Sequence, residues 1–201
     1  MDILDGHFSP SMPIGLDVVR QLRAKTRLAF DVHLMVLNNE FFICELLAIG
    51  VQRLCFHCES VLHVDRTLGL IRGSAVEAGI ALTPATPPAV LECVLEQMDF
   101  VLLMLINPGF AGHKDERQVP YAVRKVADCR RFLDERGRDV PILVDGRVSF
   151  ETIPPLVAAG ADILTAGTSC LFAAGGSFTE NLTRTQQAIK AGLSKRKVAE
   201  R

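Results

Sequence analysis

The chain has 201 residues, of which 49% are hydrophobic, and a formal net charge of −1 at pH 7. This length and composition suit one globular domain with a full apolar core. The near-neutral charge provides no basic field for nucleic acid, and no apolar run is long enough to span a bilayer. We therefore expect neither nucleic acid nor a membrane as a partner.

Predicted strands and helices alternate through the N-terminal half. Helical spacing of Leu16, Val19 and Leu22 predicts that these residues face inward, and Gly50 and Gly79 are placed to end helices. The predicted strands cover residues 2–5, 28–36, 52–57 and 80–83. The predicted helices cover residues 14–25, which follow Pro13, and residues 40–49, 64–78 and 87–98.

The C-terminal half begins with a near-continuous apolar run, residues 99–106, which is typical of a strand buried on both faces of a parallel sheet. The run breaks into Pro108-Gly-Phe-Ala-Gly112, where glycines allow backbone N–H groups to approach a ligand, as in phosphate-binding loops. A plain strand-to-helix turn is the alternative interpretation.

Two more predicted strands, residues 141–146 and 162–167, follow this loop, with a predicted helix between them at 150–159. Apolar residues at helical spacing predict a helix before the first of these strands and another after the second. In the helix before residues 141–146 these residues are Val119, Ala122, Val123, Val126 and Leu133. In the helix after residues 162–167 they are Phe178, Leu182, Ile189 and Leu193. We expect one domain over residues 1–201, with a flexible, solvated tail from about residue 194 that includes Lys195-Arg-Lys197.

Strict alternation of strands and helices predicts a parallel α/β sheet, either an open doubly wound sheet or a closed barrel. No Gly-x-Gly-x-x-Gly follows any strand, which disfavours a dinucleotide-binding sheet. Polar residues gather where strands end, as at the active-site face of a (β/α)8 barrel. Seven strands can be counted and the first begins at Met1, so a barrel of eight would place its first strand–helix unit before Met1.

Six cysteines without a secretory signal predict reduced thiols and a cytoplasmic location. Cys55-Phe-His-Cys58 has the spacing of a metal or redox pair. However, residues three apart on a strand face opposite sides, so we interpret both cysteines as structural.

Asp2, His33 and Asp145 end three different predicted strands. Carboxylates and a neutral imidazole are ligands for divalent metals, and their convergence predicts a metal site. Taken singly, each has an ordinary interpretation, as a helix cap or turn former for Asp and a hydrogen-bonded ring for His. Asp31 has the same strand parity as His33, but His33 lies nearer the end of the strand.

Several segments in order resemble the ribulose-phosphate 3-epimerase family. The specific ones are Asp31-Val-His-Leu-Met35 and Asn107-Pro-Gly-Phe-Ala-Gly112, and Val144-Asp-Gly146 is weaker alone. The resemblance also includes residues 1–10, Phe56-His57 and Ala166-Gly-Thr168, and it extends from Met1 to about Phe172. It implies a (β/α)8 barrel that uses a divalent metal to epimerise ketose phosphates next to the carbonyl.

By this resemblance, Asp2 and Asp145 are the two catalytic acid/base residues, and they ligate the metal together with His33. The metal is one divalent ion: Zn, Fe, Mn or Co. Met35 and Met104 resemble methionines beside the reacting carbons, although both also suit an ordinary core. For His57 a structural hydrogen bond is the preferred role. The substrate-binding positions are His33, Gly109, Phe110, Ala111, Gly112, Gly146, Gly167 and Thr168. The implied partner is a small phosphosugar substrate, and we expect a homo-oligomer.

The sequence departs from the family at several places, among them Leu4 where Met is usual and Ser11 where Asn is usual. The family's second metal-binding His would fall before Met1, and Arg147 stands where the family has Gly, so that it either reaches a phosphate or blocks part of the pocket. The leading interpretation is epimerisation of D-ribulose 5-phosphate to D-xylulose 5-phosphate. The alternatives are a D-allulose 6-phosphate 3-epimerase, a truncated non-catalytic phosphosugar-binding relative, and a metal-free phosphosugar isomerase.

Overall fold

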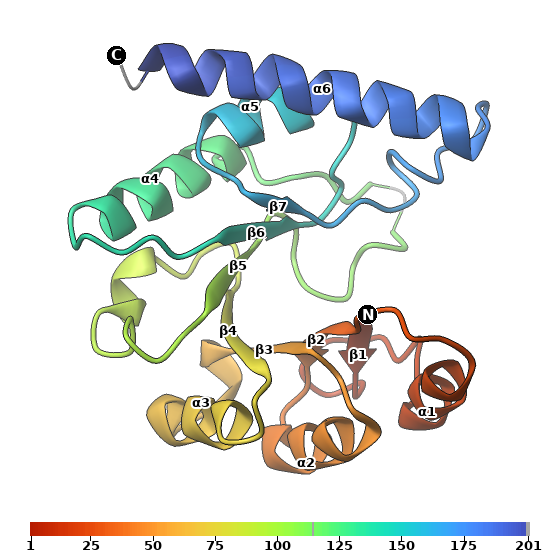
Figure 1. Cartoon of the computed structure of the whole chain (residues 1–201), viewed down its shortest axis with the longest axis vertical. Helices are drawn as coiled ribbons and strands as arrows, with labels where there is room; N and C mark the ends of the chain where they lie inside the picture. The colour runs from red at the N-terminus through yellow and green to blue at the C-terminus, as the bar shows by residue number, and fades with distance from the viewer. Residues whose placement is uncertain (114, 200–201) are drawn as a thin grey trace.

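The computed structural model describes residues 1–113 and 115–199. Seven parallel strands form one sheet in chain order, and helices cover its outer face (Figure 1). The strands are β1 (Asp2–Leu4), β2 (Asp31–Met35), β3 (Arg53–His57), β4 (Glu77–Leu82), β5 (Phe100–Met104), β6 (Ile142–Asp145) and β7 (Ile163–Leu164). The helices are α1 (Leu16–Lys25), α2 (Asn39–Ile49), α3 (Val64–Arg72), α4 (Ala122–Asp134), α5 (Ile153–Ala158) and α6 (Phe178–Ala199), with short 3₁₀ turns η1 (Cys58–Ser60) and η2 (Pro88–Leu91).

The sheet is strongly curled. In a flat sheet β2 and β6, four strands apart, would lie about 19 Å from each other, because neighbouring strands are about 4.8 Å apart. Instead, Nδ1 of His33 on β2 lies 3.7 Å from Oδ2 of Asp145 on β6. This curvature, with the described helices on the outside, confirms the barrel-type fold predicted from the sequence. The part of the chain that the structure describes forms seven strands, where a (β/α)8 barrel has eight.

Alternate strand residues face two separate apolar layers. Leu34, Phe56 and Val144 belong to the large core between the strands and the helices. Cys55, Met104 and Leu143 belong to a smaller cluster inside the curl. Both faces of the sheet are thus buried, which explains the continuous apolar runs in the sequence. Asp2, His33 and Cys55 share register positions on β1, β2 and β3, so the polar site is built on the inner face.

The helix predicted over residues 64–78 is too long. Helix α3 ends at Arg72, and the chain turns through Ala75 at a positive φ of 57° before β4 begins at Glu77. Gly79 therefore ends no helix but lies within β4. A Cβ on Gly79 would lie 2.4 Å from the Phe100 ring, so this glycine makes room for an aromatic side chain inside the curl. Similarly, only η2 forms within the helix predicted over residues 87–98.

The final helix buries only part of the face predicted: Ile189 packs against the core, but the other three predicted residues do not. Phe178, Leu182 and Leu193 are exposed, whereas Asn181 and Thr185 are buried. The reason is close packing of α6 on α5: a Cβ on Gly192 would lie 2.8 Å from the carbonyl oxygen of Pro154. The face centred on Gly192 points inward, and larger neighbours point outward.

Two smaller predictions also fail, because Leu22 on α1 and Val123 on α4 are exposed rather than inward-facing. Helix α6 extends to Ala199, and Arg196 pairs with Asp162 at 3.0 Å; the flexibility expected from about residue 194 stays a prediction. None of the helices in the described ranges combines the length and apolarity needed to cross a bilayer.

Candidate active site

Three side chains converge at the inner face of the sheet. Asp2 of β1 is the register partner of His33 on β2, and Asp145 ends β6 on the other side of the curl. Nδ1 of His33 lies 3.6 Å from Oδ1 of Asp2 and 3.7 Å from Oδ2 of Asp145. One ligand atom from each of the three residues lies within 4.8 Å of the others. The structure thus brings together the residues predicted to form a metal site.

His33 is 3% exposed and, among the described residues, its Nδ1 has no hydrogen-bond partner. Burial opposes protonation of the ring, but the adjacent Asp145 and Asp2 carboxylates outweigh it and raise the pKa of His33 to about 9. Burial also opposes ionisation of Asp2, but the contact with His33 prevails and lowers the pKa of that carboxyl group. A buried, unpartnered nitrogen between two carboxylates is a position that a cation satisfies, so the donor set fits a divalent metal.

His57 lies behind His33 and forms the structural hydrogen bonds expected of it. Its Nε2 is 2.9 Å from Nε2 of His33, and its Nδ1 is 3.3 Å from Oε2 of Glu59. Glu59 was not among the site residues predicted from the sequence. The sequence does place Glu59 two residues after His57, the last residue of β3, but this spacing does not indicate which donors bind its carboxylate.

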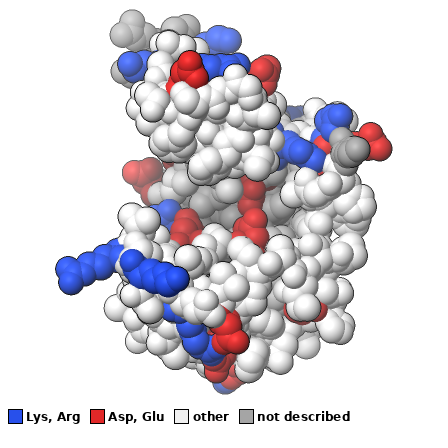
Figure 2. Space-filling view, turned by 90° about the vertical axis from the view of Figure 1, so that its right-hand side faces the viewer, with Lys and Arg blue, Asp and Glu red and all other residues white. Residues whose placement is uncertain are grey.

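A cavity of about 480 Å³ opens above the three residues. Figure 2 shows a hollow in the middle of one face, with acidic side chains exposed around it. The predicted residues that line the cavity are Asp2, Met35, Met104, Gly109, Ala111, Gly112, Asp145, Gly146, Gly167 and Thr168. Two predicted substrate-binding residues are placed otherwise. His33 lies beneath the carboxylates, and the Phe110 ring packs against His113 at 5.1 Å between centroids.

The glycines around the cavity serve two purposes. Gly109 has a φ of +84°, and a Cβ there would lie 1.3 Å from Oγ of Ser9, so only glycine fits. Ser9 in turn donates a hydrogen bond to the carbonyl oxygen of Pro108 at 2.8 Å, which ties the loop to the segment after β1. A Cβ on Gly112 or Gly167 would meet no atom within 4 Å, so space for a ligand remains beside their backbone.

Arg147 also lines the cavity. Its backbone has a positive φ of 49°, and its Nη2 donates a hydrogen bond to the carbonyl oxygen of His113 at 2.6 Å. Within residues 1–113 and 115–199, Arg147 forms no ion pair with a carboxylate. The hydrogen bond to His113 ties Arg147 to the loop that follows β5.

The two cysteines near the site are free thiols. Burial raises the pKa of Cys55 well above its ordinary value, and burial together with the charge of Glu59 raises the pKa of Cys58 to about 12. Both groups are held as neutral thiols, which fits a structural role better than a redox one.

Comparison with known sequences agrees with the family resemblance noted in the sequence. A sequence model of the Ribulose-phosphate 3 epimerase family matches residues 1–172. A ribulose-phosphate 3-epimerase of Treponema pallidum is 40% identical over 169 residues, which cover 84% of this chain and 76% of that protein. A ribulose-phosphate 3-epimerase of Bacillus subtilis is 41% identical over 170 residues, which cover 84% of this chain and 77% of that protein.

Solved structures share the fold at much lower identity. The 3-hexulose-6-phosphate synthase of Salmonella typhimurium aligns with a TM-score of 0.63 at 14% identity, over 89% of this chain and 81% of that one. A mutant tryptophan synthase α-subunit of Pyrococcus furiosus aligns with a TM-score of 0.56 at 17% identity, over 89% of this chain and 72% of that one. At these identities the likeness concerns the fold alone.

Proposed function

The chain belongs to the ribulose-phosphate 3-epimerase family, a family of isomerases, and from this membership we propose that it epimerises C3 of a ketose phosphate. The substrate we propose is D-ribulose 5-phosphate, and the product is D-xylulose 5-phosphate. The observation that carries the proposal is the pair of carboxylates, Asp2 and Asp145, on either side of the buried His33 at the base of one cavity.

Epimerisation requires that a proton leave C3 from one face and return to the other. The C3 proton is acidic because the electron pair it leaves behind delocalises onto the C2 carbonyl as an enediolate. Two carboxyl groups from opposite sides of the curl can serve the two faces, one as general base and the other as general acid. We assign these roles to Asp2 and Asp145, with their order reversed for the opposite direction of the reaction.

The residues that would hold one divalent metal are Asp2, His33 and Asp145, through a carboxylate oxygen, Nδ1 and a carboxylate oxygen respectively. When bound, the metal stabilises the negative charge that develops on the substrate oxygens. Zn, Fe, Mn and Co all accept this mixture of imidazole and carboxylate ligands.

The glycine loops suit the phosphate end of the substrate. Gly112 and Gly167 line the cavity with open space beside their backbones, and Arg147 supplies a positive charge from the same wall. A phosphate held there gives binding energy remote from C3, which positions the reacting carbon. Residues 109–112, Gly146 and Thr168 complete the proposed substrate-binding set.

The test is an epimerisation assay of the purified protein with each divalent ion in turn. D-Ribulose 5-phosphate and D-allulose 6-phosphate are compared as substrates, and product is identified by NMR. The proposal predicts conversion of D-ribulose 5-phosphate with the higher kcat/KM. Preference for the six-carbon substrate would reassign the specificity, and binding of both sugars without turnover would favour a non-catalytic relative.

A further inference from the structure

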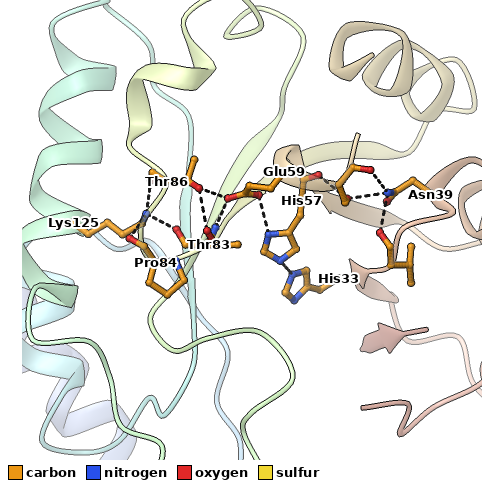
Figure 3. Close-up of polar contacts among 10 residues, drawn as sticks. His33, Asn39, His57, Glu59, Thr83, Pro84, Thr86 and Lys125 are labelled. Carbon is orange, nitrogen blue, oxygen red and sulfur yellow. Dashed lines mark hydrogen bonds and ion pairs between the residues drawn. The ribbon is translucent and has the colours of Figure 1, made fainter. Parts of the chain in front are cut away.

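Behind the three site residues, a chain of polar contacts continues through the interior (Figure 3). His33 Nε2 lies 2.9 Å from His57 Nε2, and His57 Nδ1 lies 3.3 Å from Oε2 of Glu59. The other oxygen of Glu59, Oε1, accepts hydrogen bonds from the backbone N–H of Thr83 at 2.8 Å and from the hydroxyl of Thr86. Both rings are almost completely buried, so water does not compete for these contacts.

The loop that holds Glu59 is itself fixed from helix α4. Lys125 Nζ donates to three carbonyl oxygens of this loop: Thr83 at 2.8 Å, Pro84 at 3.0 Å and Thr86 at 2.6 Å. An ammonium group has three donors, and all three are used here. The Thr83 N–H is therefore held in place facing Glu59.

The donor and acceptor in each hydrogen bond between Glu59, His57 and His33 can be assigned by starting from the Glu59 carboxylate. Burial opposes ionisation of Glu59, but hydrogen bonds from His57, Thr86 and Thr83 outweigh it and hold its pKa well below the ordinary value. An ionised carboxylate only accepts, so Nδ1 of His57 must donate. A neutral imidazole with its proton on Nδ1 has a lone pair on Nε2, so Nε2 of His57 accepts from Nε2–H of His33 at 2.9 Å.

We propose that Glu59 is a positioning residue, which acts through His57 to keep a proton on Nε2 of His33, so that a cation replacing the Nδ1 proton meets the Nδ1 lone pair between the two carboxylates. This inference rests on the proposed function, because it assigns that lone pair to a divalent cation. Hydrogen bonds to the second nitrogen of a ligating histidine commonly fix its tautomer and orientation, and their loss costs about 10–100-fold in metal affinity.

The substitution Glu59→Gln tests this directly because it preserves shape but reverses the hydrogen-bond direction. The Thr83 N–H is an obligatory donor, so the Gln oxygen must remain toward Thr83 and its NH₂ group must turn toward His57. Nδ1 of His57 then accepts and its Nε2 donates to His33, so Nε2 of His33 must accept and a neutral His33 ring keeps its one proton on Nδ1. A proton on Nδ1 occupies the position that the cation requires.

The first measurement is Zn²⁺ affinity of the metal-free protein at pH 7.5, by competition with a chromophoric chelator. We expect Glu59→Gln to weaken Zn²⁺ binding about 10–100-fold. The matched controls are Thr86→Val, which removes a hydrogen bond to the same carboxylate without reversing the chain, and Glu40→Gln, the same chemical change at an exposed residue. Both should bind Zn²⁺ within about threefold of wild type. Thermal unfolding of each metal-free variant verifies its fold.

The second measurement is the tautomer of His57, read from ¹⁵N-histidine NMR of the metal-free protein. Wild type should show a proton on Nδ1 of His57, and Glu59→Gln should show it on Nε2. Unchanged Zn²⁺ affinity in a folded Glu59→Gln protein, or a wild-type proton on Nε2 of His57, would overturn the inference. A wild type that epimerises but is insensitive to Glu59→Gln leaves the proposed function intact, whereas a wild type that binds no divalent ion contradicts that function itself.

Discussion

The two sides of the site are held by different means. The histidine side, which comprises Asp2, Asp145, His33, His57 and Glu59, is built from side chains that contact one another, with the two histidine rings buried. The glycine side, which comprises residues 109–112, Gly146 and residues 167–168, presents backbone and open space to the cavity. On the histidine side, the position and protonation of single atoms decide whether a metal can bind. On the glycine side, the open space beside the backbone decides whether the substrate fits. Changes to the histidine side should therefore affect chemistry and metal binding, and changes to the glycine side should affect substrate binding.

The largest effect is expected from Asp145→Asn. Loss of one proposed proton-transfer group should lower kcat about 10²–10⁴-fold, because Asn neither accepts nor delivers the C3 proton. Steady-state kinetics with D-ribulose 5-phosphate measures this. Asp31→Asn is the matched control, since Asp31 lies at the other end of β2 and pairs with Arg53; it should retain kcat within about threefold. An active Asp145→Asn enzyme would remove Asp145 from the proposed chemistry.

Removal of the metal should abolish the function of the histidine side and leave that of the glycine side intact. Treatment with a chelator should lower kcat/KM about 100-fold or more, and Mn²⁺, Co²⁺, Zn²⁺ or Fe²⁺ should restore it, because the metal stabilises charge in the transition state. Inorganic phosphate should still bind the metal-free protein with little change in affinity, because the glycine side does not depend on the metal. Full activity after verified metal removal would favour the metal-free isomerase interpretation.

A moderate effect is expected on the glycine side from Gly112→Leu. Space is open around Gly112, and its φ is not in the left-handed region, so the fold should tolerate the change while the cavity loses room. KM should rise about tenfold with kcat within about twofold, which is the signature of lost uniform binding. Gly69→Leu on the exposed surface of α3 is the control. A large fall in kcat instead would mean that the glycine side also takes part in the chemical step.

The smallest effect is on stability in acid. The pKa of Glu59 in the folded protein lies below its ordinary value of 4.5, so its contribution to the free energy of unfolding is present above pH 4.5 and is lost as the pH falls below it. Urea unfolding of the metal-free protein should show Glu59→Gln less stable than wild type by roughly 1–2 kcal/mol at pH 6. That difference should shrink towards pH 3.5. A difference that is constant with pH would show that ionised Glu59 contributes nothing specific.

Much of the fold could be predicted from the sequence because parallel strands buried on both faces leave continuous apolar runs, as in residues 99–106. Helix ends were predicted less well. Gly79 suggested a helix end, but it lies in β4 because the Phe100 ring needs the space of a missing side chain. The face of α6 was also mispredicted in part, because close approach of Gly192 to α5 outweighs the apolar periodicity.

Within the site, Asp2, His33 and Asp145 could be predicted from their places in three strands of one sheet, although only Asp145 ends its strand, whereas Asp2 begins β1 and His33 lies in the middle of β2. Glu59 could not, because its role depends on the side chain of His57 and on the loop fixed by Lys125, which are distant in sequence. Hydrogen-bond direction along such a chain becomes evident only when every donor and acceptor has been placed.

The most direct test of the proposed two-carboxylate epimerisation is the fate of the C3 proton. The purified, metal-loaded protein is incubated with D-ribulose 5-phosphate in D₂O, and the products are examined by NMR. If one carboxyl group removes the C3 proton and the other delivers a solvent-derived one, D-xylulose 5-phosphate should form with deuterium at C3. Formation of D-xylulose 5-phosphate that retains the original C3 proton, or no formation of it at all, would contradict the account.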